Sequence, residues 1–270
     1  MNVDEIVEAI RDLECNLPKD VEEKLLKAKE VEEGLSKMVI EAILENVRYA
    51  RENNIPMCQD TGVLEFFITS QERFFEIKNL IIEGIKKATK EVPLRKNTVN
   101  PFTRENQGEN LGRFHPIIYF EDCEKDIKID ILAKGAGSEN VSYLSMLDPA
   151  NGIEDIKRVV IQAVKNAGRK PCPPIIVGVG VGGTMEKAAY FAKKALLRPL
   201  NLENPDPDLR LLEKELLEEI NKLRIGPMGF GGKTTALGVL IEWGHCHTAS
   251  LPVAVNIQCW ALRRKTILFR

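Results

Sequence analysis

Apolar residues recur every three or four positions along the first fifty residues, a spacing typical of amphipathic helices. Pro18 and Gly34 interrupt this pattern, and both residue types commonly end helices. We therefore expect three consecutive helices, over residues 3–17, residues 20–31 and a stretch that starts after Gly34. Together they form a predicted helical segment over residues 1–54.

Beyond residue 54 the pattern alternates between strands and helices. Short apolar or alternating runs predict strands, and longer runs with helical period predict helices. The expected strands cover residues 64–69, 115–120, 126–133, 175–180, 236–243 and 252–259. The expected helices cover residues 75–90, 153–166, a stretch that begins near 184, and 206–223. This order predicts one α/β domain over residues 1–270, with mixed sheets flanked by helices and an α/β core over residues 55–270.

One long segment carries no periodic pattern. Residues 93–113 are rich in Asn, Gly and Arg, which predicts a loop, and loops of this length in compact domains are usually functional. The two strands expected after it are joined by a short acidic turn that contains Cys123, and we expect them to form a hairpin.

Composition and charge exclude several classes of partner. The chain has 38 basic and 40 acidic residues, and no tract of like charge suits a phosphate backbone. We therefore expect no nucleic-acid partner. The first residues are acidic where a signal peptide would be basic, and the apolar runs are far too short to span a membrane. The expected location is the cytoplasm, with no membrane partner.

Six cysteines are spread along the chain, too sparsely for the disulfide framework of a small secreted domain. Reduced thiols, some of them metal ligands, are the better interpretation. Cys15 lies near the apolar stripe of the first helix, where it acts as a small hydrophobic residue, and Cys123 is expected to have no role. Cys58, Cys172 and Cys259 each adjoin a turn or a strand end. Their spacing matches neither zinc ribbons nor ferredoxins, so spacing alone predicts no metal site.

The segment that begins at Cys58 carries a thiol, an amide, a carboxylate and a hydroxyl on four consecutive residues, ending at Thr61. A thiolate is a soft metal ligand, and a carboxylate two residues away can exchange protons with whatever the metal binds. The alternative interpretation is a polar loop with a buried cysteine.

Two glycine-rich segments invite nucleotide-binding interpretations. Residues 178–183 satisfy G-x-G-x-x-G between a strand and a helix, but the only acidic candidate about twenty residues further on is Glu203, in a loop. A dinucleotide site therefore stays a weak alternative. The segment before Lys233 resembles a phosphate loop, but Pro227 stands where that motif requires glycine.

Five motifs in one order resemble the iron–sulfur (class I) fumarases and L-tartrate dehydratases, in their α subunit or N-terminal half. These motifs are Pro56-Met-Cys-Gln-Asp-Thr-Gly62, Lys134-Gly-Ala-Gly-Ser138, Cys172-Pro-Pro174, Gly229-Phe-Gly-Gly-Lys233 and His247-Thr-Ala-Ser-Leu-Pro252. The resemblance covers nearly the whole chain from about residue 35. It implies a hydro-lyase that interconverts fumarate and (S)-malate, a reaction of the tricarboxylic acid cycle, with tartrate dehydration as the close alternative. A non-catalytic iron–sulfur or nucleotide-binding module is the alternative from a different class.

The resemblance also implies a [4Fe-4S] cluster held by Cys58, Cys172 and Cys259. Members of this family often have a cysteine where this chain has Leu251, so the third ligand here is the later Cys259. Three protein ligands leave one iron open as a Lewis acid for the removal of water, whereas an electron-transferring cluster ordinarily has four.

By the same resemblance, Asp60 exchanges a proton with the departing water, while Gln59, Arg95, Gly137 and His247 contact the substrate. A guanidinium binds a dicarboxylate in bidentate fashion, although many loop arginines are only solvated charges. His247 is alternatively a satisfied histidine beside a strand.

The sequence shows no evident second arginine clamp or catalytic base, and it leaves the role of Lys233 open. In the resembling family the C-terminal half supplies the missing groups, either fused or as a β subunit. We therefore expect a β-subunit partner and a dimer of αβ heterodimers that acts on a small dicarboxylate.

Overall fold

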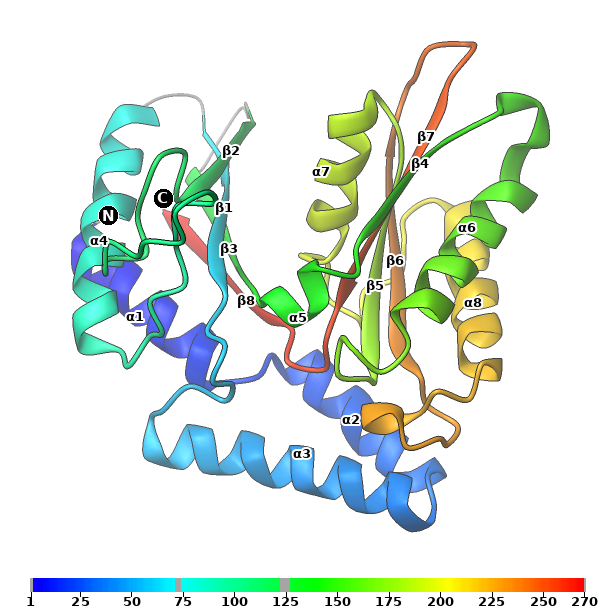
Figure 1. The fold of residues 1–270 in the computed structure, drawn as a ribbon, viewed down its shortest axis with the longest axis horizontal. Coiled ribbons are helices and arrows are strands. Elements are labelled where there is room, and N and C mark those ends of the chain that lie inside the picture. Colours follow the sequence, from blue (N-terminus) through cyan, green and yellow to red (C-terminus); the bar gives the residue numbers. More distant parts are fainter. Residues whose placement is uncertain (1, 71–73, 122–126, 270) are drawn as a thin grey trace. The chain divides into compact units, whose positions relative to one another are not determined.

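The computed structural model describes residues 2–70, 74–121 and 127–269. Within this part the predicted fold class is confirmed: two mixed sheets are flanked by helices, and the chain begins with three helices (Figure 1). These helices are α1 (Val3–Cys15), α2 (Lys19–Val31) and α3 (Gly34–Asn53). A capping box starts α1, because the Asn2 side chain accepts from the Glu5 N–H while the Glu5 carboxylate accepts from the Asn2 N–H.

The chain forms two compact units. Unit 1 comprises residues 1–18, 45–136 and 263–270, and unit 2 comprises residues 19–44 and 137–262. The single domain expected over residues 1–270 stays a prediction. None of the helices in the described part of the chain is long and apolar enough to cross a membrane.

Unit 1 contains a four-stranded sheet with strand order β2-β1-β3-β8. Its strands are β1 (Val63–Thr69), β2 (Ile117–Glu121), β3 (Ile127–Lys134) and β8 (Arg263–Phe269). The expected hairpin is wrong, because β1 lies between β2 and β3, parallel to the first and antiparallel to the second. β1 is largely buried and takes a central place, while β2 is only partly buried at the edge. The turn that carries Cys123 lies outside the described residues.

Two helices cover this sheet: α1 and α4 (Phe74–Glu91) lie side by side (Figure 1). Isoleucines of both helices and Phe66 of β1 form one buried core. The helices meet so closely that a Cβ added at Gly84 would lie 2.4 Å from Ile6 Cγ2. Burying this apolar surface is the main force that holds unit 1 together.

Unit 2 contains a second sheet, with strand order β4-β7-β5-β6. Its strands are β4 (Tyr143–Leu147), β5 (Ile175–Gly182), β6 (Ala236–Gly244) and β7 (Leu251–Gln258). Helices α6 (Gly152–Ala167) and α8 (Pro207–Lys222) pack on one face, and α7 (Met185–Ala195) packs on the other (Figure 1). β5 runs parallel to β6 and antiparallel to β7, so the start of β5 and the end of β7 lie at the same end of the sheet.

Packing explains the glycine-rich stretch that invited a dinucleotide interpretation. Gly178 and Gly180 lie inside strand β5, not in a turn after it. A Cβ added at these positions would come within 2.1 Å of the Ala192 oxygen and 2.0 Å of the Ala188 oxygen, so α7 can lie this close only on glycine. The structure therefore offers no support for a dinucleotide site.

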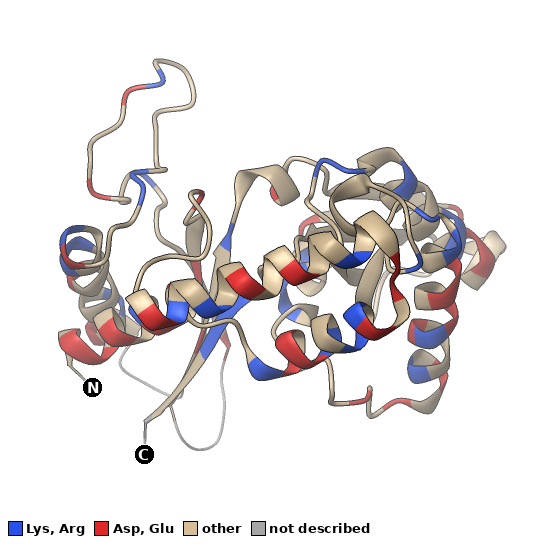
Figure 2. Cartoon of the chain, turned by 90° about the horizontal axis from the view of Figure 1, so that it is seen from below, with Lys and Arg blue, Asp and Glu red and all other residues tan. Residues whose placement is uncertain are grey.

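Basic and acidic residues are interspersed along the helices and do not gather by sign (Figure 2). Several pairs lie one helical turn apart, such as Glu83 with Lys86 at 2.9 Å. Exposed pairs of this kind contribute little stability. Their mixed signs agree with the formal net charge of -2 and with the absence of a basic tract in the sequence.

Candidate functional site

The segment after α3 is held by backbone hydrogen bonds in unit 1. Met57 is buried, its N–H donates to the Glu14 carbonyl at 2.9 Å, and its own carbonyl accepts from Asn46 Nδ2 at 2.9 Å. The next two side chains reach solvent: Cys58 is partly exposed and Gln59 is exposed. The backbone just before the predicted ligand and the predicted binding residue is thus held in place, and both of their side chains are accessible.

Asp60 is fixed at both carboxylate oxygens. Oδ1 accepts from the Gly62 N–H at 3.0 Å and from Asn97 Nδ2 at 3.3 Å, and Oδ2 accepts from the Ala136 N–H at 2.7 Å. Asn97 also donates to the Gly62 carbonyl at 2.9 Å, which ties the long loop to this turn. These contacts give the carboxylate one orientation.

An open hollow of about 520 Å³ in unit 1 brings three predicted site residues together. Cys58, Gln59 and Arg95 all line it, along with Thr61. The Arg95 N–H donates to Thr61 Oγ1 at 3.1 Å, so the backbone of the long loop is held where Arg95 lines the hollow. Residues that carry a thiol, an amide and a guanidinium therefore line one space large enough for a small dicarboxylate.

A buried ion pair adjoins this segment, because the carbonyl of one of its members, Glu14, accepts the Met57 N–H. Arg263 is 1% exposed, Glu14 is fully buried, and Arg263 Nη1 donates to Glu14 Oε2 at 2.7 Å. Burial raises the pKa of Glu14 to about 7, and this effect outweighs the opposing charge and hydrogen bond of Arg263. The nearby charge of Asp60 raises the same pKa further.

This raised pKa predicts a specific dependence of stability on pH. The folded chain holds the Glu14 proton up to about pH 7, whereas the ordinary value is 4.5. The contribution of Glu14 to the free energy of unfolding is thus greatest below about pH 4.5, falls as pH rises to about 7, and then stays level, a loss of about 3 kcal/mol. We expect Glu14→Gln to gain stability relative to the wild type over this interval, as measured by urea unfolding at pH 5, 6, 7 and 8. A difference that does not change with pH contradicts this prediction.

In unit 2, Gly137, Cys172 and Cys259 gather at one end of the sheet. Cys172 comes just before β5 and Cys259 just after β7, and the Trp260 N–H approaches the Cys172 carbonyl at 3.5 Å. A Cβ added at Gly137 would lie 3.6 Å from the Lys170 oxygen, beside the same loop. Cys172 has φ of 54°, a left-handed conformation that turns the chain sharply into the strand.

His247 lies at the other end of this sheet. It belongs to the loop between β6 and β7, is exposed, and its Nδ1 accepts the Ala249 N–H at 3.1 Å. The eight residues of β7 separate it from Cys259, and at about 3.3 Å per residue they span roughly 26 Å. The structure therefore does not bring His247 together with the two cysteines of unit 2.

Lys233 has a structural partner. Its Nζ lies 3.0 Å from Glu33 Oε1, and its backbone N–H donates to Glu32 Oε1 at 2.7 Å. Ser36 Oγ donates to the Gly231 carbonyl at 2.7 Å. These bonds hold the glycine-rich loop against the start of α3.

The donor chemistry of the cysteines fits an iron–sulfur cluster. Cys58 lies in unit 1, while Cys172 and Cys259 lie in unit 2, and all three are partly exposed. Gln258 Nε2 donates to Cys259 Sγ at 3.6 Å, and hydrogen bonds of this kind to sulfur tune such clusters. Within the described residues, no three His, Cys, Asp or Glu side chains form a group that holds a metal ion. The three-cysteine site stays a prediction.

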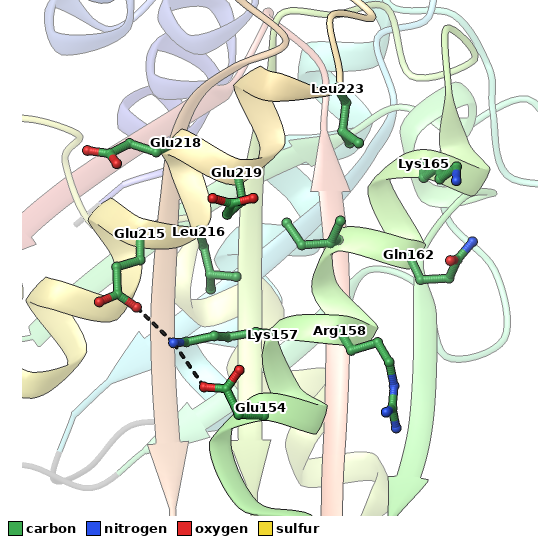
Figure 3. A pocket seen from close by; sticks show the side chains of 11 residues that line it. Glu154, Lys157, Arg158, Gln162, Lys165, Glu215, Leu216, Glu218, Glu219 and Leu223 are labelled. Carbon is green, nitrogen blue, oxygen red and sulfur yellow. Dashed lines mark ion pairs between the residues drawn. The ribbon is translucent and has the colours of Figure 1, made fainter.

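Another hollow in unit 2, of about 620 Å³, lies between α6 and α8 (Figure 3). Lys157 crosses it and pairs with Glu154 at 3.2 Å and with Glu215 at 2.9 Å. None of the predicted site residues lines this groove.

Comparison with known proteins identifies the family. A family model described as fumarate hydratase (Fumerase) matches residues 3–268. This chain belongs to that family. Both fumarate hydratases and tartrate dehydratases are hydro-lyases, so the prediction of a hydro-lyase enzyme is confirmed.

Three relatives illustrate the range of the family. A Methanocaldococcus jannaschii protein, provisionally named L(+)-tartrate dehydratase subunit alpha, is 49% identical over 97% of this chain and 95% of its own length. The Escherichia coli (strain K12) L(+)-tartrate dehydratase subunit alpha is 33% identical over 95% of this chain and 86% of its own length. A Geobacillus stearothermophilus protein, provisionally named fumarate hydratase class I, is 38% identical over 92% of this chain but only 51% of its own length.

Sequence reasoning missed Asn97, Glu14 and Arg263. Glu14 carried a signal, because it lies four residues after Ile10 and seven after Val7, on the apolar stripe of α1. A carboxylate at such a position is buried and needs a partner. The positions of Asn97 and Arg263 in the sequence carried no such signal.

Proposed function

We propose that this chain is the α subunit of a [4Fe-4S] hydro-lyase that reversibly hydrates fumarate to (S)-malate. The observation that supports this most directly is the hollow in unit 1, which combines the thiol of Cys58 with the amide of Gln59 and the guanidinium of Arg95. Asp60 follows in the same turn, with both carboxylate oxygens fixed. Dehydration of a 2-hydroxy acid needs anion binding and proton transfer, and a metal held nearby can assist the departure of hydroxide as a Lewis acid.

The residues of this chain divide the work among them. Arg95 binds one carboxylate of the substrate through paired N–H groups, and the Gln59 amide bonds a second polar atom. Asp60 exchanges the proton of the departing or arriving water, and its fixed orientation removes the cost of arranging it during the reaction. Cys58, Cys172 and Cys259 would hold the cluster, which supplies a Lewis-acidic iron without a protein ligand.

The position of His247 bears on the assembly. Because β7 separates it from Cys259 by roughly 26 Å, one four-carbon substrate cannot touch His247 and a cluster bound by Cys259 of the same copy. We propose that His247 contacts substrate bound to a second copy, which a dimer of αβ heterodimers allows.

A β subunit completes the proposed enzyme. Two of the relatives carry names that include "subunit alpha", and the fumarate hydratase class I relative is about twice as long as the segment it shares with this chain. We therefore propose that a separate β subunit provides the groups which that longer chain carries in its other half. L-tartrate is the second candidate substrate, because the 49% identical relative carries that name.

Anaerobic reconstitution with iron and sulfide tests the proposal, with the chain alone and with its candidate β subunit. We expect visible cluster absorption in the chain, and turnover of malate, fumarate or tartrate only with both subunits. Full malate dehydration by the chain alone would contradict the need for a β subunit. A cluster that forms but supports no turnover with the β subunit would favour a non-catalytic iron–sulfur protein, and failure to form any cluster would refute the proposed cofactor.

A further inference from the structure

The interior of unit 1 contains a guanidinium close to two carboxylates. Arg263 is held on one side by Glu14, at 2.7 Å from Nη1. A Cβ added at Gly135 would lie 3.6 Å from Arg263 Nη2 and 3.2 Å from Asp60 Oδ2. Arg263 Nη2 and the Asp60 carboxylate therefore both lie next to Gly135. They flank the space that a side chain at this position would fill.

The register of the sheet explains why Arg263 lies there. Arg263 is the first residue of β8 and pairs with Ala133 of the neighbouring β3. Ala136, whose N–H donates to Asp60 Oδ2, follows Ala133 by three residues. The pairing of β3 with β8 thus places the Ala136 N–H and the Arg263 guanidinium near the Asp60 carboxylate, which lies beyond the end of these strands.

Burying an arginine in this place is costly unless it is well paired. A guanidinium that is 1% exposed has lost nearly all its water, and a buried ion pair seldom stabilises a protein more than apolar residues of the same volume. Stability alone therefore explains the Arg263–Glu14 pair poorly. A role in orienting the neighbouring Asp60 carboxylate explains it better.

We propose that Arg263, anchored by Glu14, is a positioning residue that acts with the Gly62, Asn97 and Ala136 donors to keep Asp60 in its orientation. This inference rests on the proposed function, in which Asp60 carries the proton. Arg263 itself touches no substrate: it is buried, and it does not line the hollow that contains Arg95. Its loss should therefore lower kcat and leave KM nearly unchanged.

The test compares Arg263→Lys and Arg263→Gln with a matched control, Arg264→Gln, at the next position of β8, in the reconstituted complex with the β subunit. Lysine keeps the charge but lacks the planar fork through which one amino group bonds Glu14 while the other lies near Asp60. We expect kcat to fall roughly 10- to 100-fold in both Arg263 variants, since small misplacement of a catalytic group has effects of that size. KM should change by less than about twofold, and the control should retain wild-type kcat.

A second readout does not depend on turnover. In the full chain without cluster, the NMR signal of the Asn97 side-chain amide reports on its bond to Asp60 Oδ1, and it should shift in Arg263→Lys but not in Arg264→Gln. If Arg263→Gln fails to fold, Arg263→Lys decides alone. A folded Arg263→Lys variant with wild-type kcat and an unshifted Asn97 signal overturns the proposal.

Combination with Asp60→Asn separates this inference from the proposed function. If Arg263 acts through Asp60, adding Arg263→Lys to Asp60→Asn should cause no further loss of kcat. Additive losses would mean that Arg263 acts elsewhere, and the inference would fail. If Asp60→Asn alone keeps normal turnover, the proposed role of Asp60 fails first.

Discussion

Replacing Cys172 by Ser is expected to abolish both the visible absorption of the reconstituted cluster and all hydro-lyase activity. Three cysteines are the smallest set that holds a [4Fe-4S] cluster with one iron open, and a serine hydroxyl is a poor substitute for the soft thiolate. The same loss is expected for Cys58→Ser and Cys259→Ser. The measurement is the absorption spectrum after anaerobic reconstitution, with iron and sulfide content determined on the same samples.

Two other cysteines provide controls. Cys15 is 1% exposed in the core of unit 1, and burial raises the pKa of its thiol to about 11, so it remains a protonated packing residue. Cys246 is exposed in the loop between β6 and β7, where its Sγ donates to the Ser250 carbonyl at 3.2 Å. Cys15→Ala and Cys246→Ser should both keep the cluster. An equal loss of absorption in these controls would mean that the three-cysteine assignment is wrong.

Long periodic segments were predictable from the sequence because their own residues determine them. The three N-terminal helices and the strands at β1 and β5 have local apolar patterns that need no partner to be recognised. β4 and β8 were missed for a physical reason. β4 has only five residues. β8 begins with three basic residues, so its apolar run is too short to be recognised as a strand. Both form strands because their backbones pair with a neighbouring strand, as β8 pairs with β3.

The candidate site likewise combines residues that local sequence could predict with residues that only the fold brings together. Cys58, Gln59 and Asp60 are adjacent in the chain, so their chemistry could be predicted together. The partners of Asp60 could not, because Asn97 is 37 residues away and Ala136 is 76 residues away. Arg263 reaches Glu14 across 249 residues, and only the pairing of β8 with β3 brings it there. Sequence pattern thus predicted the candidate reacting groups together, while the groups that orient them depend on sheet register.

Changing Asp60 to Asn is expected to lower turnover by roughly 10²- to 10⁴-fold while the cluster is retained, the range typical of losing a general acid or base. Asparagine preserves the size of the side chain and one carbonyl oxygen, so the bond from the Ala136 N–H or the Gly62 N–H can persist. The amide cannot exchange a proton at neutral pH. The measurement is kcat of the reconstituted complex, with visible absorption as proof that the cluster is present.

The neighbouring residue supplies the matched control for this change. Gln59 is exposed in the same turn and lines the hollow, but it does not titrate. Gln59→Ala should therefore raise KM for the dicarboxylate with a smaller effect on kcat, because it removes a binding contact and leaves the proton carrier intact. Opposite effects on kcat and KM in the two variants would assign proton transfer to Asp60 and binding to Gln59. If Asp60→Asn instead turned over normally with its cluster in place, the proton would have to be carried by another residue, and the fixed orientation of Asp60 would serve only to shape the turn between Cys58 and Gly62.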